Sequence, residues 1–257
     1  MIMILFTILL WIIILDNLLL GIFLLIKAFQ IKFINLYSMG IGFVLFFVGL
    51  FGNFVLGYGY FFEELFVFIG YFLIAFFTYL TFHRRKVDYK ARLLLYLSLV
   101  FMFTRIFLGL LVEINLNPVT RYSELIIINC CLFLVFYWLG WSSLSAYKRL
   151  RNINVAPWLK TRYKAISIVS FLWPFHALLG LFLPWNTEFG DPSDIISLIH
   201  FSITVILSLI FIIGMIIAWI IPEYLKNYIN SKKGYEPPDD KELSEDDLMK
   251  LIKSQLP

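Results

Sequence analysis

The sequence predicts an all-α integral membrane protein, a bundle of seven transmembrane helices with its N-terminus outside and its C-terminus in the cytoplasm. The first observation is composition: the 257 residues are 61% hydrophobic and 15% charged, with a mean hydropathy of +0.87. Soluble domains are roughly 45–50% apolar and about 25% charged. The second is a series of long apolar runs along the chain, and the third is the gathering of basic residues on one side of those runs.

The apolar runs are the expected membrane helices. About 20 consecutive apolar residues cross a bilayer core as a helix, and seven runs of about this length occur. The first carries Asp16 and Asn17 and lacks a basic segment ahead of it, so we expect a retained helix and not a cleaved signal peptide. The expected helices are 2–26, 38–59, 65–82, 92–112, 122–146, 164–184 and 195–222, in one transmembrane domain over residues 1–228.

The charges between the runs predict the orientation. Lys and Arg follow the first, third, fifth and seventh runs, as in "HRRK" (83–86) and "YKRLR" (147–151), whereas the alternate loops hold Arg121 among several acidic residues. The positive-inside rule then places the N-terminus outside a multi-pass protein of the cell membrane. Topology and anionic lipid headgroups account for the basic residues, so we expect no nucleic-acid partner.

Residues 229–257 are expected to form an acidic cytoplasmic tail. Ser244 and Asp247 fit a capping box, and Leu248, Leu251 and Ile252 share one face. These features predict a short amphipathic helix near 244–255. Together with the basic loop 147–164 it is a candidate contact for a cytoplasmic protein partner, and a frayed end is the alternative.

Polar residues within the runs predict a pocket. Such residues are costly in lipid, so they face the bundle interior and mark function or helix packing. At about 1.5 Å of rise per residue, several lie roughly 7–12 Å below the outer surface. We expect a small-molecule ligand to enter this layer from outside. The expected ligand-binding residues are Asn53, Glu64, Tyr71, Arg105, Asn129, Trp173, His176 and His200.

Arg105 is the costliest of these residues. An arginine near the middle of a membrane helix costs at least about 2.5–3.5 kcal/mol unless it is paired or hydrated. A carboxylate at the outer mouth or an anionic ligand is its expected partner. The alternative to a ligand-binding role is that Arg105 only clamps helices together. The sequence leaves both interpretations open.

The stretch "FLWPFHALLG" (171–180) predicts a kink in the sixth helix. Pro174 lacks a backbone N–H and frees the carbonyl of Ser170, so the helix should bend near the membrane centre. Trp173 and His176 share a face at the bend. We expect Pro174 to be a hinge, and a packing kink without a switching role is the alternative.

Several kinds of chemistry are not expected. No lysine occurs between 195 and 222, so a retinal Schiff base in the last helix is excluded. His176 and His200 are too few for a zinc site, and a b-type haem held by both is a minor alternative to no cofactor. We expect no metal site. No Gly-rich phosphate loop, nucleophile elbow or catalytic dyad is evident, so we do not expect an enzyme.

The expected function is that of a receptor-like or sensor-like membrane protein. A small, anionic ligand would bind in the outer half and signal through the Pro-kinked sixth helix. The alternatives are a small-solute or proton transporter or channel subunit, a b-haem redox subunit, and a scaffold whose polar layer only locks helices together.

Overall fold

The computed structural model describes residues 2–83, 88–151, 155–187, 194–219 and 223–232, and every regular element among them is helical. The residues 233–257 lie outside this range, and with them the helix expected near 244–255. The elements are α1 (Ile2–Gln30), α2 (Asn35–Phe54), α3 (Tyr60–Thr78), a π-helical turn η1 (Tyr79–His83), α4 (Tyr89–Ile114), α5 (Pro118–Arg151), α6 (Pro157–Leu172), α7 (Phe175–Gly180), α8 (Ile195–Trp219) and α9 (Glu223–Ser231).

Six of the helices are long and apolar enough to cross a membrane: α1, α2, α3 with η1, α4, α5 and α8. The chain is therefore a multi-pass membrane protein, as its composition predicts. The expected sixth helix, 164–184, differs from the structure. The observed helix begins earlier, with Pro157 at the first helical position of α6, where a missing N–H costs nothing. It is then divided at Pro174 into α6 and the short α7.

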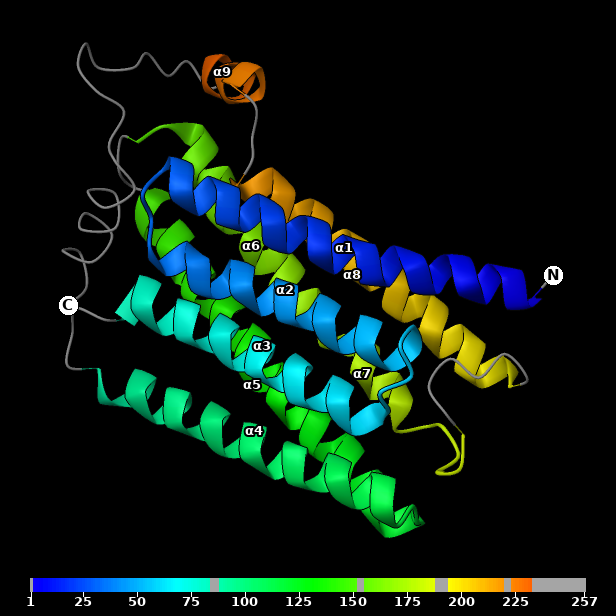
Figure 1. The fold of residues 1–257 in the computed structure, drawn as a ribbon. Coiled ribbons are helices and arrows are strands. Elements are labelled where there is room, and N and C mark those ends of the chain that lie inside the picture. Colours follow the sequence, from blue (N-terminus) through cyan, green and yellow to red (C-terminus); the bar gives the residue numbers. More distant parts are fainter. Residues whose placement is uncertain (1, 84–87, 152–154, 188–193, 220–222, 233–257) are drawn as a thin grey trace.

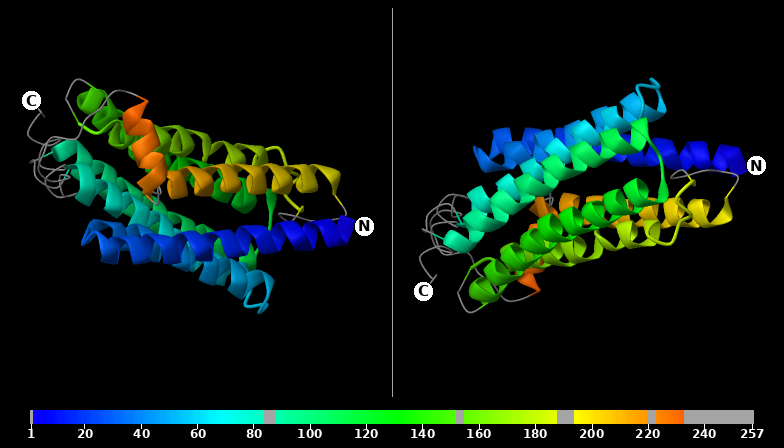
Figure 2. Two further views of the ribbon diagram at one scale, coloured as in Figure 1. Left: turned by 90° about the horizontal axis from the view of Figure 1, so that it is seen from above. Right: turned by 90° about the horizontal axis from the view of Figure 1, so that it is seen from below.

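The helices run back and forth and form a closed ring (Figures 1 and 2). Around the ring, α1 packs on α2, α2 on α3, α3 on α4, α4 on α5, α5 on α6, α6 on α8, and α8 again on α1. Because α3 also contacts α5 directly, α4 lies on the outer side of the bundle. The N-terminus and the connections α2–α3 and α4–α5 lie at one end, which we call the N-terminal end (Figure 1).

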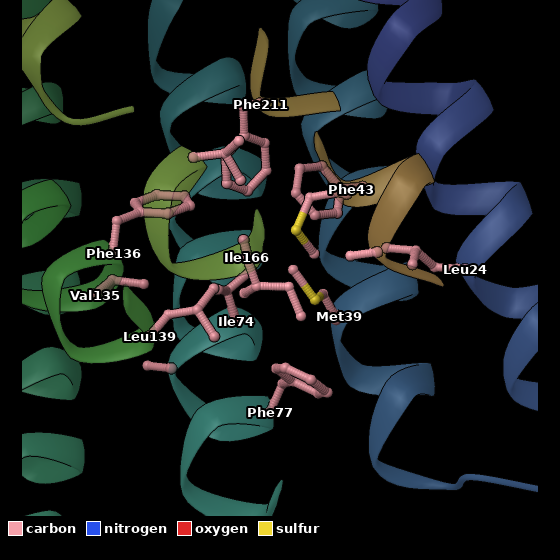
Figure 3. Close-up of a cluster of buried hydrophobic side chains, with 14 of the residues drawn as sticks. Leu24, Met39, Phe43, Ile74, Phe77, Val135, Phe136, Leu139, Ile166 and Phe211 are labelled. Carbon is pink, nitrogen blue, oxygen red and sulfur yellow. The ribbon is translucent and has the colours of Figure 1, made fainter. Parts of the chain in front are cut away.

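Apolar side chains from α1, α2, α3, α5, α6 and α8 fill the centre of the ring (Figure 3). Lipid is as apolar as a leucine side chain, so this core stabilises the bundle by close packing and not by exclusion of water. The labelled members are Leu24, Met39, Phe43, Ile74, Phe77, Val135, Phe136, Leu139, Ile166 and Phe211.

Two glycines set the close approach of α2 and α3. A Cβ atom at Gly42 would lie 2.9 Å from the carbonyl oxygen of Gly70, and one at Gly70 would lie 2.7 Å from the carbonyl oxygen of Gly42. Both distances are too short for any side chain, so the backbones touch only because both residues are glycine. Gly57 and Gly59 have a different role, because both have positive φ in the turn between α2 and α3. The helix α2 ends at Phe54, before residue 59, where the sequence analysis expects its end.

The last described helix, α9, lies across the end of the bundle opposite the N-terminus (Figures 1 and 2). Leu225 and Ile229 pack against the core cluster, and Lys226 Nζ lies 4.5 Å from the centre of the Trp158 ring on α6. Beneath α9, the buried Arg162 donates from Nε to the carbonyl oxygen of Ala218 at 2.8 Å. This end of α8 is therefore tied to α6.

Candidate functional site

A cavity of about 660 Å³ opens at the N-terminal end of the bundle. Residues of α1, α2, α3, α4, α5, α7 and α8 line it, so it lies inside the ring of helices. Of the eight expected ligand-binding residues, seven line the cavity and Asn129 does not. The seven are Asn53, Glu64, Tyr71, Arg105, Trp173, His176 and His200.

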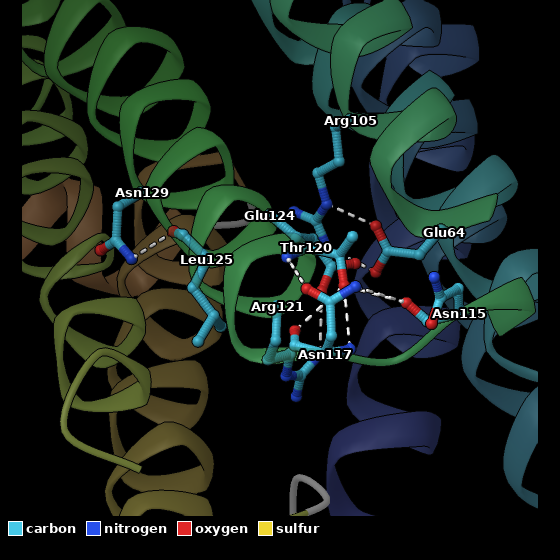
Figure 4. A network of polar contacts seen from close by, with 9 residues as sticks. All are labelled: Glu64, Arg105, Asn115, Asn117, Thr120, Arg121, Glu124, Leu125 and Asn129. Atoms are coloured by element: carbon cyan, nitrogen blue, oxygen red, sulfur yellow. Dashed lines mark hydrogen bonds and ion pairs between the residues drawn. The ribbon is translucent and has the colours of Figure 1, made fainter. Parts of the chain in front are cut away.

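Arg105 of α4 is paired inside the protein. Its Nε and Nη2 atoms donate to the two carboxylate oxygens of Glu64 on α3 (Figure 4). Its guanidinium carbon lies 3.6 Å from the centre of the Phe68 ring. Arg105 and Glu64 are both buried. A bidentate pair of this kind satisfies both charges at once. Of the two partners that the sequence leaves open for Arg105, the structure supplies the carboxylate.

A second ion pair lies in the first turns of α5. Arg121 Nη1 donates to Glu124 Oε2 at 2.8 Å, and Glu124 is fully buried (Figure 4). Asn117 caps α5, since its Oδ1 accepts from the N–H groups of Val119 and Thr120 at 3.0 Å. Sequence analysis does not single out Glu124 and misses its burial. The available signal is the spacing of seven from Glu124 to the buried Cys131 and Trp138.

The two other carboxylates that line the cavity accept hydrogen bonds without a cation. Asn53 of α2 donates from Nδ2 to Glu63 Oε2 at 2.6 Å, which joins α2 to α3. Glu113 of α4 accepts at Oε2 from the backbone N–H of Phe61 at 2.7 Å. This N–H is one of those that a helix start leaves without an intrahelical partner. Glu113 therefore caps α3 from a neighbouring helix.

Asn129 and His200 hold α7 in place by bonding to its backbone. Asn129 Nδ2 donates to the carbonyl oxygen of Ala177 at 3.1 Å, and His200 Nε2 lies 3.0 Å from the carbonyl oxygen of His176. The Ala177 carbonyl is free because the N–H of Leu181 bonds to Leu178 instead. Axial haem ligation by His200 through Nε2 would require this contact with His176 to break.

The break between α6 and α7 lies at the cavity wall. The Trp173 and His176 rings are 4.4 Å apart between centroids, and His176 Nδ1 lies 2.6 Å from the carbonyl oxygen of Trp173. Trp173 also packs on Phe211 of α8 at 5.5 Å and Phe136 of α5 at 6.1 Å between ring centroids. One side chain thus contacts both the cavity and the apolar core.

A polar cluster at the opposite end of the bundle joins η1, α4 and α5. His83 Nδ1 lies 3.0 Å from Asp88 Oδ2, and His83 Nε2 lies 3.0 Å from Ser142 Oγ. This order of bonds is that of a Ser-His-Asp triad. Trp138 Nε1, however, donates to the same His83 Nε2 at 3.3 Å, and Ser142 is buried in α5. The cluster therefore acts as a link between three elements.

Asp88 is also the N-cap of α4, where its Oδ1 accepts from the N–H of Ala91 at 3.1 Å. Burial raises the pKa of the Asp88 carboxyl, but the hydrogen bonds from Ala91 and His83 lower it by more. The net pKa lies below the usual aspartate value, so the folded protein favours the charged carboxylate.

No protein-family model, curated protein or solved structure matches the chain. Because a fold alone does not define a function, the cavity, the paired charges around it and the helix break at its wall are the basis for assigning one.

Proposed function

We propose that this chain is a receptor-like protein of the cell membrane, which binds a small organic ligand in the cavity at its N-terminal end and signals through α6 and α7. One observation carries the proposal: Trp173, at the helix break, lines the cavity and packs on Phe136 and Phe211 of the core. A ligand that displaces Trp173 therefore acts on the contacts between α6–α7 and the helices α5 and α8. The volume of about 660 Å³ falls in the usual range for small-molecule sites, about 300–1,000 Å³.

The topology belongs to the proposal. We propose that α6 and α7 together form the sixth of seven spans, because α7 follows α6 directly and both lie between α5 and α8. The N-terminal end faces outward, since most of the 21 Lys and Arg residues follow the helices at the other end. Broken helices within a membrane are tolerated where they line a cavity, and α7 does so.

The signal leaves the bundle at the opposite end. Arg162 and Lys226 join α6 to α8 and α9 there, so a tilt of α6 moves the basic first turns of α6 and the helix α9 together. These segments, with residues 244–255, are where a cytoplasmic protein partner would bind. No catalytic step and no cofactor is part of this proposal.

The orientation is tested by cysteine labelling. In a background with Cys130→Ser and Cys131→Ala, single cysteines are placed at Leu116→Cys, between α4 and α5, and at Lys232→Cys, after α9. A membrane-impermeant maleimide should label Leu116→Cys in intact cells and Lys232→Cys only after permeabilisation. The reverse pattern would overturn the orientation.

The function is tested by screening small molecules for thermal stabilisation of the full-length protein. Val67 lines the cavity, and Val67→Phe should abolish stabilisation by true cavity ligands. The same change at Val100, which is 57% exposed on α4, is the matched control and should have no effect. Spin labels at Tyr89→Cys and Lys164→Cys then report the distance between α4 and α6 near the opposite end.

The receptor proposal expects a cavity ligand to change this distance. The transporter alternative expects the same ligand to accumulate inside liposomes that contain only this protein. Accumulation without a change in the distance would favour transport and overturn the receptor proposal. Stabilisation that Val67→Phe leaves unaltered for every hit would show that the cavity is not the binding site.

A further inference from the structure

The charges around the cavity are unequal. Its lining includes the carboxylates of Glu63, Glu64 and Glu113 and the guanidinium groups of Arg105 and Arg121. Each guanidinium already has a carboxylate partner, because Arg105 pairs with Glu64, and Arg121 pairs with Glu124. Neither Glu63 nor Glu113 forms an ion pair with any residue that the structure describes. The lining therefore holds two carboxyl groups that have no cationic partner among the described residues.

Glu63 is the better placed of these two carboxylates to bind a ligand. Its only hydrogen bond among the described residues comes from Asn53, at Oε2, so Oε1 retains its capacity to accept. Glu113 is instead committed to α3, since one oxygen caps the helix at Phe61 and the other would lie 3.0 Å from a Cβ atom at Gly59.

His176 independently indicates a ligand that donates hydrogen bonds. Its Nδ1 contacts the carbonyl oxygen of Trp173 at 2.6 Å, and a carbonyl can only accept, so Nδ1 carries the hydrogen. In the neutral ring Nε2 is then an acceptor. Among the described residues Nε2 has no hydrogen-bond partner, although the side chain is only 9% exposed and lines the cavity. The atom is therefore open to a hydrogen bond from a ligand or a water in the cavity.

The walls of the cavity suit a positively charged organic molecule. Tyr60, Tyr71 and Trp173 present aromatic rings to it, and such rings attract cations at their faces. The remaining lining is largely aliphatic, which suits the apolar part of an organic molecule.

We propose that the cavity binds a small organic cation, a protonated amine whose ammonium group pairs with Glu63 and which donates a hydrogen bond to His176 Nε2. This rests on the proposed function, since it names the ligand class of the same cavity. It also replaces the anion that an unpaired Arg105 suggests, because Glu64 already neutralises that arginine. An anion would meet carboxylates without a cation to bind it, whereas an amine supplies the donors that Glu63 Oε1 and His176 Nε2 accept.

The experiment compares probes of matched shape and different charge on the full-length protein in nanodiscs. Phenethylamine, benzylamine and tryptamine are the cations, and the corresponding carboxylates and alcohols are the anionic and neutral analogues. Calorimetry and thermal unfolding measure binding. At least one amine should bind, and its carboxylate analogue should bind about tenfold or more weakly, which corresponds to about 1.4 kcal/mol.

Two variants locate the ammonium group. Glu63→Gln keeps the shape and the bond to Asn53 but removes the charge, so it should weaken amine binding about tenfold or more. Glu113→Gln is the matched control at the cavity rim and should leave amine affinity within about twofold. His176→Phe should weaken amine binding, because it removes the Nε2 acceptor. Unfolding temperatures without probe confirm that each variant is folded.

The outcomes separate this inference from the proposed function. If alcohols or carboxylates bind, Val67→Phe abolishes that binding, and no amine binds, the cavity remains the ligand site and the cation proposal fails. Amine binding that depends on Glu113 and not on Glu63 overturns the assignment of Glu63. If Val67→Phe alters the binding of no probe, both proposals fail.

Discussion

Arg105 of α4 and Glu64 of α3 form a bidentate ion pair inside the helical bundle, with both carboxylate oxygens of Glu64 engaged. The two side chains are only 5% and 1% exposed. A buried ion pair contributes little net stability compared with apolar residues of similar size, yet the loss of one partner leaves an uncompensated charge. The pair therefore fixes which faces of α3 and α4 meet, next to the cavity.

Removing one member of this pair should be far more harmful than removing both. Arg105→Leu or Glu64→Leu alone should reduce the free energy of unfolding by about 3–5 kcal/mol, and the double variant should recover most of that loss. Thermal unfolding of the four proteins in one detergent, followed by tryptophan fluorescence, gives the double-mutant cycle. Additive losses in the double variant would mean that the two charges do not interact.

The contact between α2 and α3 gives a steric prediction. Gly70→Ala places a methyl group 2.3 Å from the Phe46 ring of α2 and 2.7 Å from the carbonyl oxygen of Gly42, so the helices must separate, and the cost should be about 1–3 kcal/mol. Gly109→Ala is the matched control, because its nearest neighbour is the Glu64 Cγ at 3.3 Å. Thermal unfolding should rank Gly70→Ala well below Gly109→Ala, and equal losses would contradict the close contact of backbones.

The inward faces of the helices could be predicted from the sequence, but their partners could not. Ser98, Met102, Arg105 and Gly109 recur at helical spacing, and all four are buried in α4. Periodicity identifies a face without saying which helix it meets or at what height. The partner of Arg105 depends on the relative heights of α3 and α4, which the sequence does not contain.

Backbone groups explain the residues that sequence analysis interprets differently. Asn129 is an expected ligand-binding residue, but in the structure it does not line the cavity and donates to the carbonyl of Ala177. That carbonyl is free only because α7 ends in a tight turn, in which Leu181 bonds to Leu178. Glu124 is missed because the sequence does not show that the first turns of α5 pack inside the bundle, where Glu124 is fully buried.

Asn129 should matter for the order of α7. Asn129→Leu leaves the Ala177 carbonyl without its side-chain donor, at a cost of about 1–3 kcal/mol. Hydrogen exchange followed by mass spectrometry should therefore show faster exchange over residues 175–183, with little change in α2 and α3. Cys130→Leu, on the exposed side of α5, is the control. Unaltered exchange in α7 would show that its position does not depend on Asn129.

Acid should weaken the cluster of His83, Asp88 and Ser142. The pKa of Asp88 is lower in the folded protein than its ordinary value, so its charge contributes stability above the unfolded pKa of about 3.9. That contribution is lost as the pH falls through the folded pKa. Asp88→Asn can still cap α4 but lacks the charge. The difference in unfolding temperature between wild type and Asp88→Asn should shrink as the pH falls below about 4.

Pro174 provides the sharpest test of signalling through α6 and α7. Pro174→Ala restores a backbone N–H that can donate to the carbonyl of Ser170, and a proline within a helix costs about 3 kcal/mol relative to alanine. The variant should therefore favour one continuous helix and unfold at the same or a higher temperature. Binding of a cavity ligand should persist, while the ligand-dependent change in distance between labels at Tyr89→Cys and Lys164→Cys should be lost.

Pro157→Ala, at the first turn of α6, is the matched control, because an N–H at that position has no partner within the helix. If Pro174→Ala keeps the full distance change at equal ligand affinity, the break serves packing alone, and the signal does not depend on it.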